Sequence, residues 1–382
     1  MSMKKLAALV LALAMILSLA ACGSEGGAMD TQQQTNTNTD TNNATATSDN
    51  LPDVNWKMVT TWSAGTAHAV TDETFCEYVS KLSNGHFTID YYSVGEMCDQ
   101  AEVFDYVSKG TVQCGGDWAG YWAGRDVVFE LLATTMNLFT QMDYVLWCYE
   151  GGGLDIYQGV FGDYNMTYFP LVYHLAESGI RSSKPVSTVE DLQTMKVRLG
   201  GVLAGRVAEK LGITPVTVAG GELYESLQRG VIDAGEYSTP YADYTFHLEE
   251  VTNYWVAPAW YQSAGCNGVM INLDAWNELP DNYKEIIEMA SYLTMFDAIH
   301  RYDYNDIGAT NDILASGTQL TEWDPEAWDT FCATAEEVYE EARAESEWFD
   351  TCYTSMLDYK ENIAQYRDML DMYGFGFNSD TE

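Results

Sequence analysis

Basic residues are scarce in this chain. Its 382 residues include 18 lysines and arginines against 57 aspartates and glutamates, which gives a formal net charge of −39. A field of this sign repels phosphate backbones and anionic lipid surfaces, so it argues against nucleic acid or a lipid surface as the binding partner. It also means that a small anion would need a local cation, because the field of the whole protein opposes its approach.

Recognisable enzyme signatures are also missing. The chain contains no HExxH, no G-x-S-x-G and no G-x-x-x-x-G-K-[ST] motif. The run that begins at Asp303 opens like a calcium loop, but its twelfth position is Leu314, so we reject that reading. The five histidines are scattered, and a structural role is expected for each. Carboxylates are so abundant that the sequence leaves a glycosidase pair open.

Cysteine spacing gives no sign of a metal centre. Seven cysteines follow Cys22, with no CxxC or cysteine/histidine spacing of the kind that binds zinc. An odd number leaves at least one of them unpaired. Cys76, Cys114 and Cys148 stand among apolar residues, and we expect them to be buried thiols.

Long apolar runs are confined to the N-terminus. Lys4 and Lys5 precede an apolar stretch over 6–19, which is too short to span a bilayer comfortably. The sequence then reads Leu-Ala-Ala up to Cys22, a pattern typical of a bacterial lipoprotein cleavage site. We therefore expect a signal peptide over 1–22 with lipidation of Cys22, and an extracytoplasmic protein anchored to the membrane. An ordinary secretion signal is the alternative.

A low-complexity segment and a long folded region follow. Residues 23–50 consist almost entirely of small and polar side chains, which cannot bury enough surface to offset chain entropy. We expect a disordered tether there, reaching on the order of 30 Å. Residues 51–382 are long enough for two lobes and a sizeable core.

Strand and helix patterns alternate through this region. Residues 57–62 and 86–92 predict strands, with a helix capped by Thr71 between them. In the stretch 196–262, we predict a strand that ends at Arg198 and a helix from 202 to 211. A strand over 214–218 and a helix from 222 to 229 follow. A buried strand over 231–234 then leads to Glu236. Ligands of α/β sheets bind beyond the carboxyl ends of the strands, where Arg198 and Glu236 would both lie.

An internal echo suggests two related lobes. Residues 102–115 match residues 222–235 in side-chain character at nearly every position. In each segment an amphipathic helix ends at a basic residue and a glycine, and a short buried strand follows. Such junctions are common in α/β proteins, but two in the same register favour an α/β protein with two lobes and a cleft between them.

The C-terminal third predicts long helices. One pattern runs from Pro280 to about Ser316. A second begins with Asp324 as N-cap and Pro325 as the first helical residue, and its apolar repeat continues to Ile363. Unbroken, that helix would be about 60 Å long at ~1.5 Å per residue, more than one lobe needs. It would either pack back over its own subunit or form a homodimer.

The order of these residues resembles the substrate-binding proteins of tripartite ATP-independent periplasmic (TRAP) transporters. The resemblance covers roughly residues 55 to 290, and its details are most similar to the subgroup that binds 2-oxo and 2-hydroxy monocarboxylates. The matching segments are 62–65, 95–97, 102–110, 151–153, 196–198, 211–216, 222–230 and 231–236. This resemblance implies a two-lobed fold like that of periplasmic binding proteins, no enzymatic activity, and the membrane subunits of a TRAP transporter as partners.

The resemblance also implies a set of site residues. Arg198 would grip the carboxylate of a small organic acid with two parallel hydrogen bonds. Glu236 and Tyr237 would supply carboxylate and backbone oxygens to a cation, here Na⁺ or Ca²⁺, that also touches the substrate. Trp62 and Tyr121 are candidate substrate-binding residues. Taken singly, these two and four further aromatic residues belong either to the core or to the wall of the pocket: Trp118, Tyr237, Trp260 and Tyr261.

Two positions depart from the pattern of the subgroup. Glu177 stands where relatives have glutamine, and Gln262 stands where relatives tend to have a carboxylate. The extra charge of Glu177 favours Ca²⁺ as the cation; alternatively, Glu177 accepts a hydrogen bond from a substrate amine or hydroxyl with no metal present. Two other functions stay open from the sequence: an exported sugar-binding protein of an ATP-driven importer and a carboxylate-dependent glycosidase.

Overall fold

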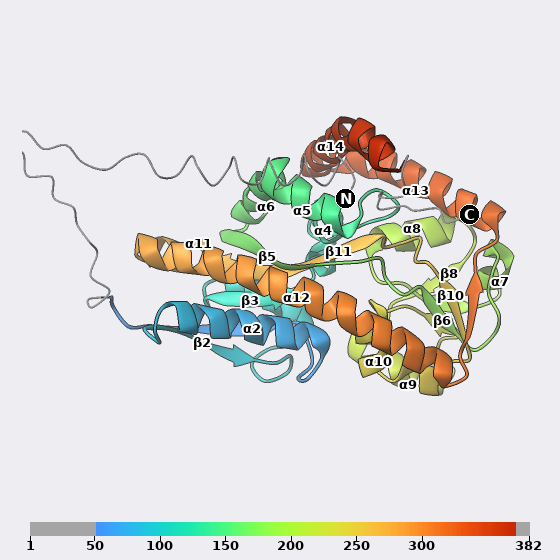
Figure 1. Cartoon of the computed structure of the whole chain (residues 1–382), viewed down its shortest axis with the longest axis horizontal. Coiled ribbons are helices and arrows are strands. Elements are labelled where there is room, and N and C mark those ends of the chain that lie inside the picture. Colours follow the sequence, from blue (N-terminus) through green and yellow to red (C-terminus); the bar gives the residue numbers. More distant parts are fainter. Residues whose placement is uncertain (1–50, 372–382) are drawn as a thin grey trace, which may run out of the picture. The chain divides into compact units, whose positions relative to one another are not determined.

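The computed structural model describes residues 51–371, so the signal peptide and tether predicted for residues 1–50 lie outside the described range. The described residues form two mixed β-sheets of six strands each, with helices packed against them (Figure 1). This arrangement confirms the expected α/β class. It also provides two sheet edges from which loops can converge on one site.

The first sheet has the strand order β2-β1-β3-β11-β4, and β5 pairs with β11 off this path. β1 runs parallel to β2 and β3, whereas β11 runs antiparallel to β3, β4 and β5. The strands of this sheet are β1 (Val54–Thr60), β2 (Phe87–Tyr92), β3 (Cys114–Asp117), β4 (Thr134–Thr135), β5 (Met166–His174) and β11 (Ala264–Asn272).

The predicted strand–helix–strand unit is present at the start of the fold. α2 (Ala67–Leu82) connects β1 to β2 and buries Phe75 and Val79 against the first sheet. The predicted N-cap, however, is wrong. Thr66 caps the helix by accepting a hydrogen bond from Ala69, and Thr71 lies inside the first turns, where its hydroxyl donates to the Ala67 carbonyl. The chain offers two threonines, and the earlier one begins the helix.

The second sheet has the order β12-β10-β6-β9-β7-β8. Its strands are β6 (Ile180–Ser182), β7 (Lys196–Arg198), β8 (Thr214–Val216), β9 (Ala234–Gly235), β10 (Tyr254–Ala257) and β12 (Gln319–Glu322). The buried strand predicted over 231–234 is thus shorter and lies later, because Val231 is 52 % exposed and only the last two residues before Glu236 pair with β6 and β7.

Shorter helices connect and flank the strands. They are α3 (Val103–Ser108), α4 (Val128–Ala133), α5 (Gln141–Glu150), α6 (Gly153–Gly162), α7 (Val189–Gln193), α8 (Val202–Lys210), α9 (Leu223–Gln228), α10 (Pro240–Thr245) and α11 (Leu273–Glu278). Single 3-10 turns lie at η2 (Gln100–Glu102), η3 (Ala119–Trp122), η4 (Gly220–Glu222) and η5 (Leu248–Glu250). The helices α3 and α9 correspond to the two similar segments 102–115 and 222–235. Each helix is followed by a glycine of positive φ and then by a strand, as predicted.

A single long helix packs along both parts of the fold. α12 (Asp281–Ala315) has Pro280 as its N-cap and Ser316 as its C-cap, which agrees with the helical pattern predicted from Pro280 to about Ser316. It packs on α2 and β5, which belong with the first sheet, and on α10, which lies beside the second (Figure 1). Through Tyr302 and Ala298 it also contributes to the cluster beneath the site described below.

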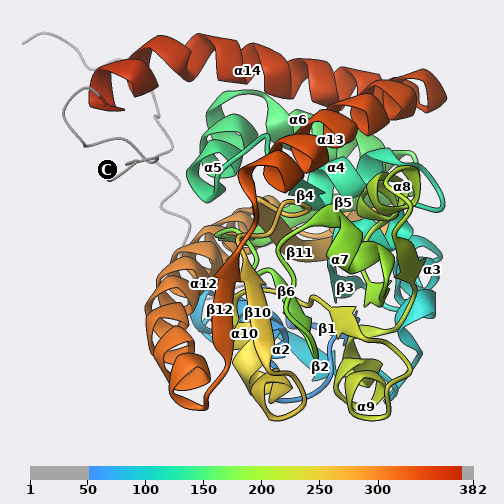
Figure 2. The ribbon, with the colours of Figure 1, turned by 90° about the vertical axis from the view of Figure 1, so that its right-hand side faces the viewer.

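The C-terminal helix predicted as one continuous element is two helices. α13 (Pro325–Glu345) ends at Ser346, whose backbone is extended, and α14 (Glu347–Asp371) follows at once. Figure 2 shows α14 crossing above α4, α5 and α6 while α13 lies next to α8. α14 buries Phe349, Cys352 and Met356. The apolar repeat that predicted a single long helix therefore divides between two helices that pack within the subunit.

The cysteines confirm the expectation of buried thiols. Cys76, Cys114 and Cys148 are buried, and all seven cysteines of the described range are free of disulfide bonds. Only Cys332 among them is partly exposed. Across residues 51–371, no helix combines the length and the apolar character that a membrane crossing requires.

Candidate functional site

A cavity lies where the ends of strands from both sheets meet. Its volume is about 40 Å³, which provides space for about three water-sized groups. The lining residues are Trp62, His68, Trp118, Tyr121, His174, Glu177, Arg198, Gly200, Glu236, Tyr237, Ser238, Gln262 and Asn267. All seven residues predicted to bind substrate or cation are in this set.

Arg198 is delivered into the cavity by the second sheet. It is the last residue of β7 and pairs with Val216 of β8 and Gly235 of β9, so its backbone is held on both sides. Its Nη1 donates to the backbone carbonyl of Glu236 at 2.5 Å and to Oε1 of the same residue at 2.7 Å. Its Nε donates to the Val218 carbonyl at 3.3 Å. The guanidinium is therefore buried and fixed from three directions.

Glu236 stands at the carboxyl end of β9, the strand next to Arg198. Its Oε1 accepts a hydrogen bond from the Gly200 backbone N–H as well as from Arg198. The turn at Gly200 thus lies against the carboxylate. A β-carbon on Gly200 would come within 3.1 Å of Oε1, so a glycine leaves the space that this contact uses.

A further buried carboxylate supports the same turn from beneath. Glu130 of α4 accepts hydrogen bonds from the backbone N–H groups of Val202 and Leu203, at the N-terminus of α8. Gly201 has a φ of +95°, and a β-carbon there would overlap Oε1 of Glu130 at 2.2 Å. Burial raises the pKa of Glu130 to about 7, although the backbone hydrogen bonds favour its ionised form.

Glu177 and Gln262 form the next part of the cavity. The backbone N–H of Glu177 donates to the Gln262 carbonyl at 3.1 Å, and the Gln262 side chain donates to Oε1 of Glu177 at 2.8 Å. Oε2 of Glu177 is buried and has no hydrogen-bond partner. Burial, and after it the charge of Glu236, hold the pKa of Glu177 well above its ordinary value.

The two glutamates fit a hard cation. Oε2 of Glu177 lacks a partner, Glu236 is close enough to raise the pKa of Glu177, and every oxygen in this group suits Na⁺ or Ca²⁺. When bound, such an ion would offset negative charge of the two carboxylates beside an anionic ligand, and Ca²⁺ would offset twice as much as Na⁺. Glu177 and Glu236 are the residues that would hold it, together with the backbone at Tyr237.

A buried ion pair ties the two glutamate-bearing loops together. Asp243 of α10 accepts hydrogen bonds from the Ser178 hydroxyl, from the Ser238 backbone N–H at 3.0 Å and from Nε of Arg181 at 3.3 Å. Ser178 follows Glu177, and Ser238 lies two residues after Glu236. Burial raises the pKa of Asp243 to about 6, and the charge of Arg181 opposes that rise.

The aromatic candidates divide into two groups. Trp62 and Tyr121 line the cavity as predicted, with ring centroids 6.0 Å apart, and Trp118 and Tyr237 also line it. Trp260 and Tyr261 do not line it. They are buried in the core, where Trp260 stacks on Phe331 at 4.5 Å.

Four lining residues were not predicted from the sequence: His68, His174, Ser238 and Asn267. His68 lies in the first turn of α2, His174 is the last residue of β5, and Asn267 lies within β11. These positions are far apart in the chain and share no motif. Only the pairing of β5 with β11 and the packing of α2 bring them together.

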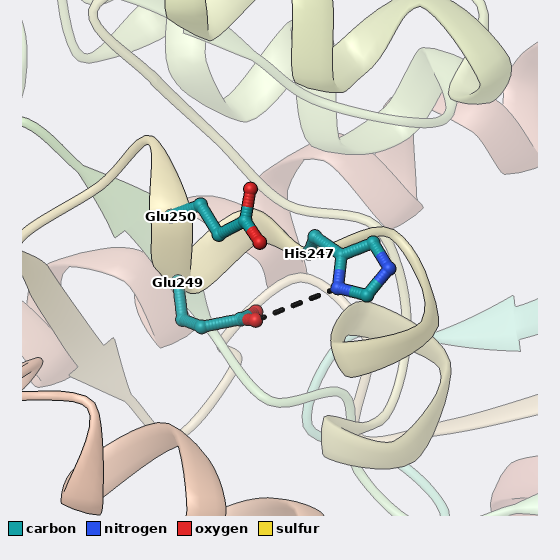
Figure 3. A group of neighbouring side chains, drawn as sticks. All are labelled: His247, Glu249 and Glu250. Atoms are coloured by element: carbon teal, nitrogen blue, oxygen red, sulfur yellow. Dashed lines mark ion pairs between the residues drawn. The ribbon is translucent and has the colours of Figure 1, made fainter.

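A second group of potential metal ligands lies outside the cavity. His247, Glu249 and Glu250 approach one another at η5 (Figure 3). These side chains already have partners within the protein. Nδ1 of His247 lies 3.7 Å from Glu249, and Glu250 accepts a hydrogen bond from the Tyr224 hydroxyl at 3.1 Å. None of the three lines the cavity.

One protein family matches most of this chain. A family model described as bacterial extracellular solute-binding protein, family 7, matches residues 58–346. A monocarboxylate 2-oxoacid-binding periplasmic protein of Nostoc sp. is 29 % identical over 333 residues, which covers 87 % of this chain and 91 % of the relative.

Two solved structures of TRAP solute-binding proteins share the fold. The protein of Bordetella bronchiseptica superposes with a TM-score of 0.80 at 25 % identity, over 85 % of this chain and 98 % of that chain, and is described as a dimer with calcium and picolinate in its active site. The protein of Pseudoalteromonas atlantica superposes with a TM-score of 0.79 at 23 % identity, over 84 % of this chain and 98 % of that one, and holds sodium and pyruvate. The chain described here belongs to the family 7 extracellular solute-binding proteins, which serve TRAP transporters.

Proposed function

We propose that this protein captures a small 2-oxo or 2-hydroxy monocarboxylate together with a cation and delivers it to the membrane subunits of a TRAP transporter. The observation that carries the proposal is the buried group of Arg198, Glu177 and Glu236 in one small cavity. Arg198 supplies a planar fork for a carboxylate. The paired glutamates need a cation if a further anion is to enter between them.

The relatives support this assignment from a separate direction. The Nostoc relative is described as binding monocarboxylate 2-oxoacids, and the two solved structures hold a cation together with a small carboxylate. Neither the sugar-binding protein of an ATP-driven importer nor the glycosidase receives support from these comparisons, since family members are transport proteins.

Calorimetry with three ionic conditions tests the proposal. Pyruvate and lactate would be titrated into the full-length chain in Ca²⁺, in Na⁺, and in chelator without Na⁺. We expect binding in at least one cation and a loss of affinity of tenfold or more without either. Affinity that is indifferent to both chelator and Na⁺ removal contradicts the cation bridge, and no binding of any carboxylate contradicts the function itself.

We further propose that Cys22 carries a lipid that anchors the protein outside the cytoplasmic membrane. The Leu-Ala-Ala sequence before Cys22 supports this, and a family of extracytoplasmic binding proteins is consistent with export. Cys22→Ser should release the protein from membranes while ligand affinity stays unchanged, because tether and binding domain are separate segments. Continued membrane attachment of this variant in cell fractionation would contradict the lipid anchor.

We also propose a homodimer in which α14 takes part. Leu357, Tyr366 and Met369 of this helix are 37 %, 55 % and 51 % exposed, and a groove of about 880 Å³ lies between α14 and α5. Exposed apolar residues along one element are typical of an interface. Sedimentation of the wild type and of Tyr366→Glu would test it: a dimer that the substitution weakens supports the proposal, and a monomer at micromolar wild-type concentration contradicts it.

A further inference from the structure

One wall of the cavity contains buried polar atoms that have no partner. They are Nε1 of Trp62, Nε1 of Trp118, Nδ2 of Asn267, Nδ1 of His68 and both ring nitrogens of His174. All five side chains are at least 90 % buried, and all five line the cavity. An unsatisfied buried polar group costs about 1–3 kcal/mol, so six such atoms on residues that line one cavity favour a bound group that satisfies part of them.

These five residues come from one side of the fold. They lie on or next to elements of the first sheet and α2, whereas Arg198, Glu236 and Tyr237 come from the second sheet. The cavity therefore has a charged wall and an uncharged wall. The charged wall can bind the carboxylate of a ligand and a metal cation. The unpartnered polar atoms of the uncharged wall would bind another part of the ligand.

The uncharged wall is continuous. Trp62 stacks on His68 with ring centroids 4.6 Å apart, and His68 meets His174 edge to face at 5.7 Å. His174 of β5 is paired with Gly265 of β11, two residues from Asn267. Alternate residues of a strand share a face, so His174 and Asn267 are diagonal neighbours on the face turned to the cavity.

Burial in this wall disfavours the charged form of both imidazoles, because a buried cation without a partner is costly. Burial, and after it the positive charge of Arg301, lower the pKa of His68 to about 3. Burial, His68 and Arg301 hold the pKa of His174 well below its ordinary value. A neutral imidazole offers one donor and one acceptor, whereas an indole N–H and an amide NH₂ only donate.

This combination selects one kind of chemical group. A second carboxylate offers no donor to the imidazoles, and Arg198 is the only cation among the lining residues. An ammonium group would face the indole and amide donors. A hydroxyl both donates and accepts, and it carries no charge that would need compensation in a buried site.

The keto oxygen of a simple 2-oxo acid cannot satisfy this wall alone. It has two lone pairs, and the proposed cation competes for one of them, against six unpartnered nitrogen atoms. The volume of about 40 Å³ also leaves no space for a long chain. A short acid with one more hydroxyl brings one further donor and two further acceptors to this wall and adds only one atom to the chain.

We propose that Trp62, Trp118, Asn267 and the histidine pair form a neutral hydroxyl-binding subsite, and that the physiological ligand is a short hydroxylated carboxylate with a hydroxyl on carbon 3. The inference rests on the proposed function, since the carboxylate of this ligand is the group that Arg198 binds. It narrows the ligand from monocarboxylates in general to the class of 2,3-dihydroxy or 3-hydroxy-2-oxo acids of three or four carbons.

A matched ligand series tests the subsite. Propanoate, lactate, 3-hydroxypropanoate and glycerate differ only in their hydroxyl groups and would be titrated into the full-length chain at saturating Ca²⁺ or Na⁺. We expect glycerate to bind at least tenfold more tightly than lactate. In Asn267→Leu and in His174→Phe this ratio should fall toward one, while Leu175→Ala, which alters an exposed neighbour of the site, should keep it.

The outcomes separate the two hypotheses. If lactate binds as tightly as glycerate in the wild type, the subsite is wrong and the proposed function stands. If glycerate binds more tightly but both variants, folded by circular dichroism, keep the wild-type ratio, these residues are not the subsite. If no acid of the series binds in either cation, the proposed function fails and the subsite fails with it.

Discussion

Nη1 of Arg198 lies 2.7 Å from Oε1 of Glu236, and both side chains are almost fully buried. The guanidinium of Arg198 is thus already paired with a carboxylate of the same cavity. A ligand carboxylate that reaches Arg198 has to share the guanidinium with Glu236. A metal ion that takes part of the charge of Glu236 would make that sharing easier, which links carboxylate affinity to cation affinity.

Arg198→Lys should weaken carboxylate binding tenfold or more. An ammonium group replaces a planar fork, so the two parallel hydrogen bonds to a carboxylate are lost. The contacts to Glu236 and to the Val218 carbonyl would also be incomplete. Calorimetry gives the affinity, and Arg229→Lys, at an exposed ion pair of α9, is the control. Unchanged affinity in Arg198→Lys would remove this residue from the site.

Glu177→Gln should reduce Ca²⁺ affinity more than Na⁺ affinity. It removes one of two carboxylates, and calcium sites depend on the number of charged ligands, so a loss of about tenfold or more is expected for Ca²⁺. Glu225→Gln removes one charge from the exposed surface of α9 and controls for the net charge of the protein. Unchanged affinity for both ions in Glu177→Gln would contradict the assignment of Glu177 as a cation ligand.

Cation affinity should also rise with pH in the wild type. Burial, and after it Glu236, hold the pKa of Glu177 well above its ordinary 4.5, so the carboxyl has to lose a proton before it can bind a cation. Affinity should therefore increase as pH rises toward that pKa, and one proton should be released on binding. In Glu177→Gln this dependence should disappear. Calorimetry in buffers of different ionisation enthalpy measures the proton count.

Some residues of this site could be predicted from local sequence patterns, and others could not. Arg198 and Glu236 follow adjacent strands of one sheet, so strand patterns and family position were enough to bring them together. His68, His174 and Asn267 carry no such signal, because α2, β5 and β11 meet only through tertiary packing. A neutral polar wall assembled from three distant segments leaves no periodicity in the sequence.

The errors in the fold have local causes. The break between α13 and α14 falls at Ser346, whose extended backbone interrupts a repeat of apolar residues that continues on both sides. Helical periodicity reports which face is buried and does not register a one-residue break. The early start of α2 after Thr66 has a similar origin, since two threonines five positions apart could each have capped the helix.

Glu130→Gln should remove a pH dependence of stability near neutrality. The pKa of Glu130 is raised from its ordinary 4.5 to about 7 by burial, so the folded state favours the protonated carboxyl. Its contribution to the free energy of unfolding is fully present below pH 4.5 and is lost as pH rises through 7. Glutamine does not titrate, so between pH 4 and pH 8 the variant should gain up to about 3 kcal/mol relative to the wild type.

Urea unfolding at a series of pH values measures this difference. Glu209→Gln, at an exposed position of α8, should run parallel to the wild type over the whole range. If Glu130→Gln also runs parallel, Glu130 does not titrate near neutrality.

Gly179→Ala should both destabilise the protein and weaken ligand binding. Gly179 has a φ of +108°, which L-residues rarely adopt, and a β-carbon there would lie 2.1 Å from the Val256 carbonyl oxygen. β10 pairs with β6 directly after this point, at Val256 and Ile180. The substitution therefore forces the loop that carries Glu177 away from β10, at a cost of about 1–3 kcal/mol.

Gly205→Ala is the matched control for this prediction, with the opposite expected sign. Gly205 lies within α8, has an ordinary helical φ, and an added β-carbon would meet no atom within 4 Å. Alanine in a helix interior is favoured over glycine by roughly 0.5–1 kcal/mol, so this variant should be more stable than the wild type. Thermal unfolding compares the two, and calorimetry compares their ligand affinities. A Gly179→Ala protein with wild-type stability and affinity would show that the loop before β6 tolerates displacement, and that Glu177 does not depend on it for its position.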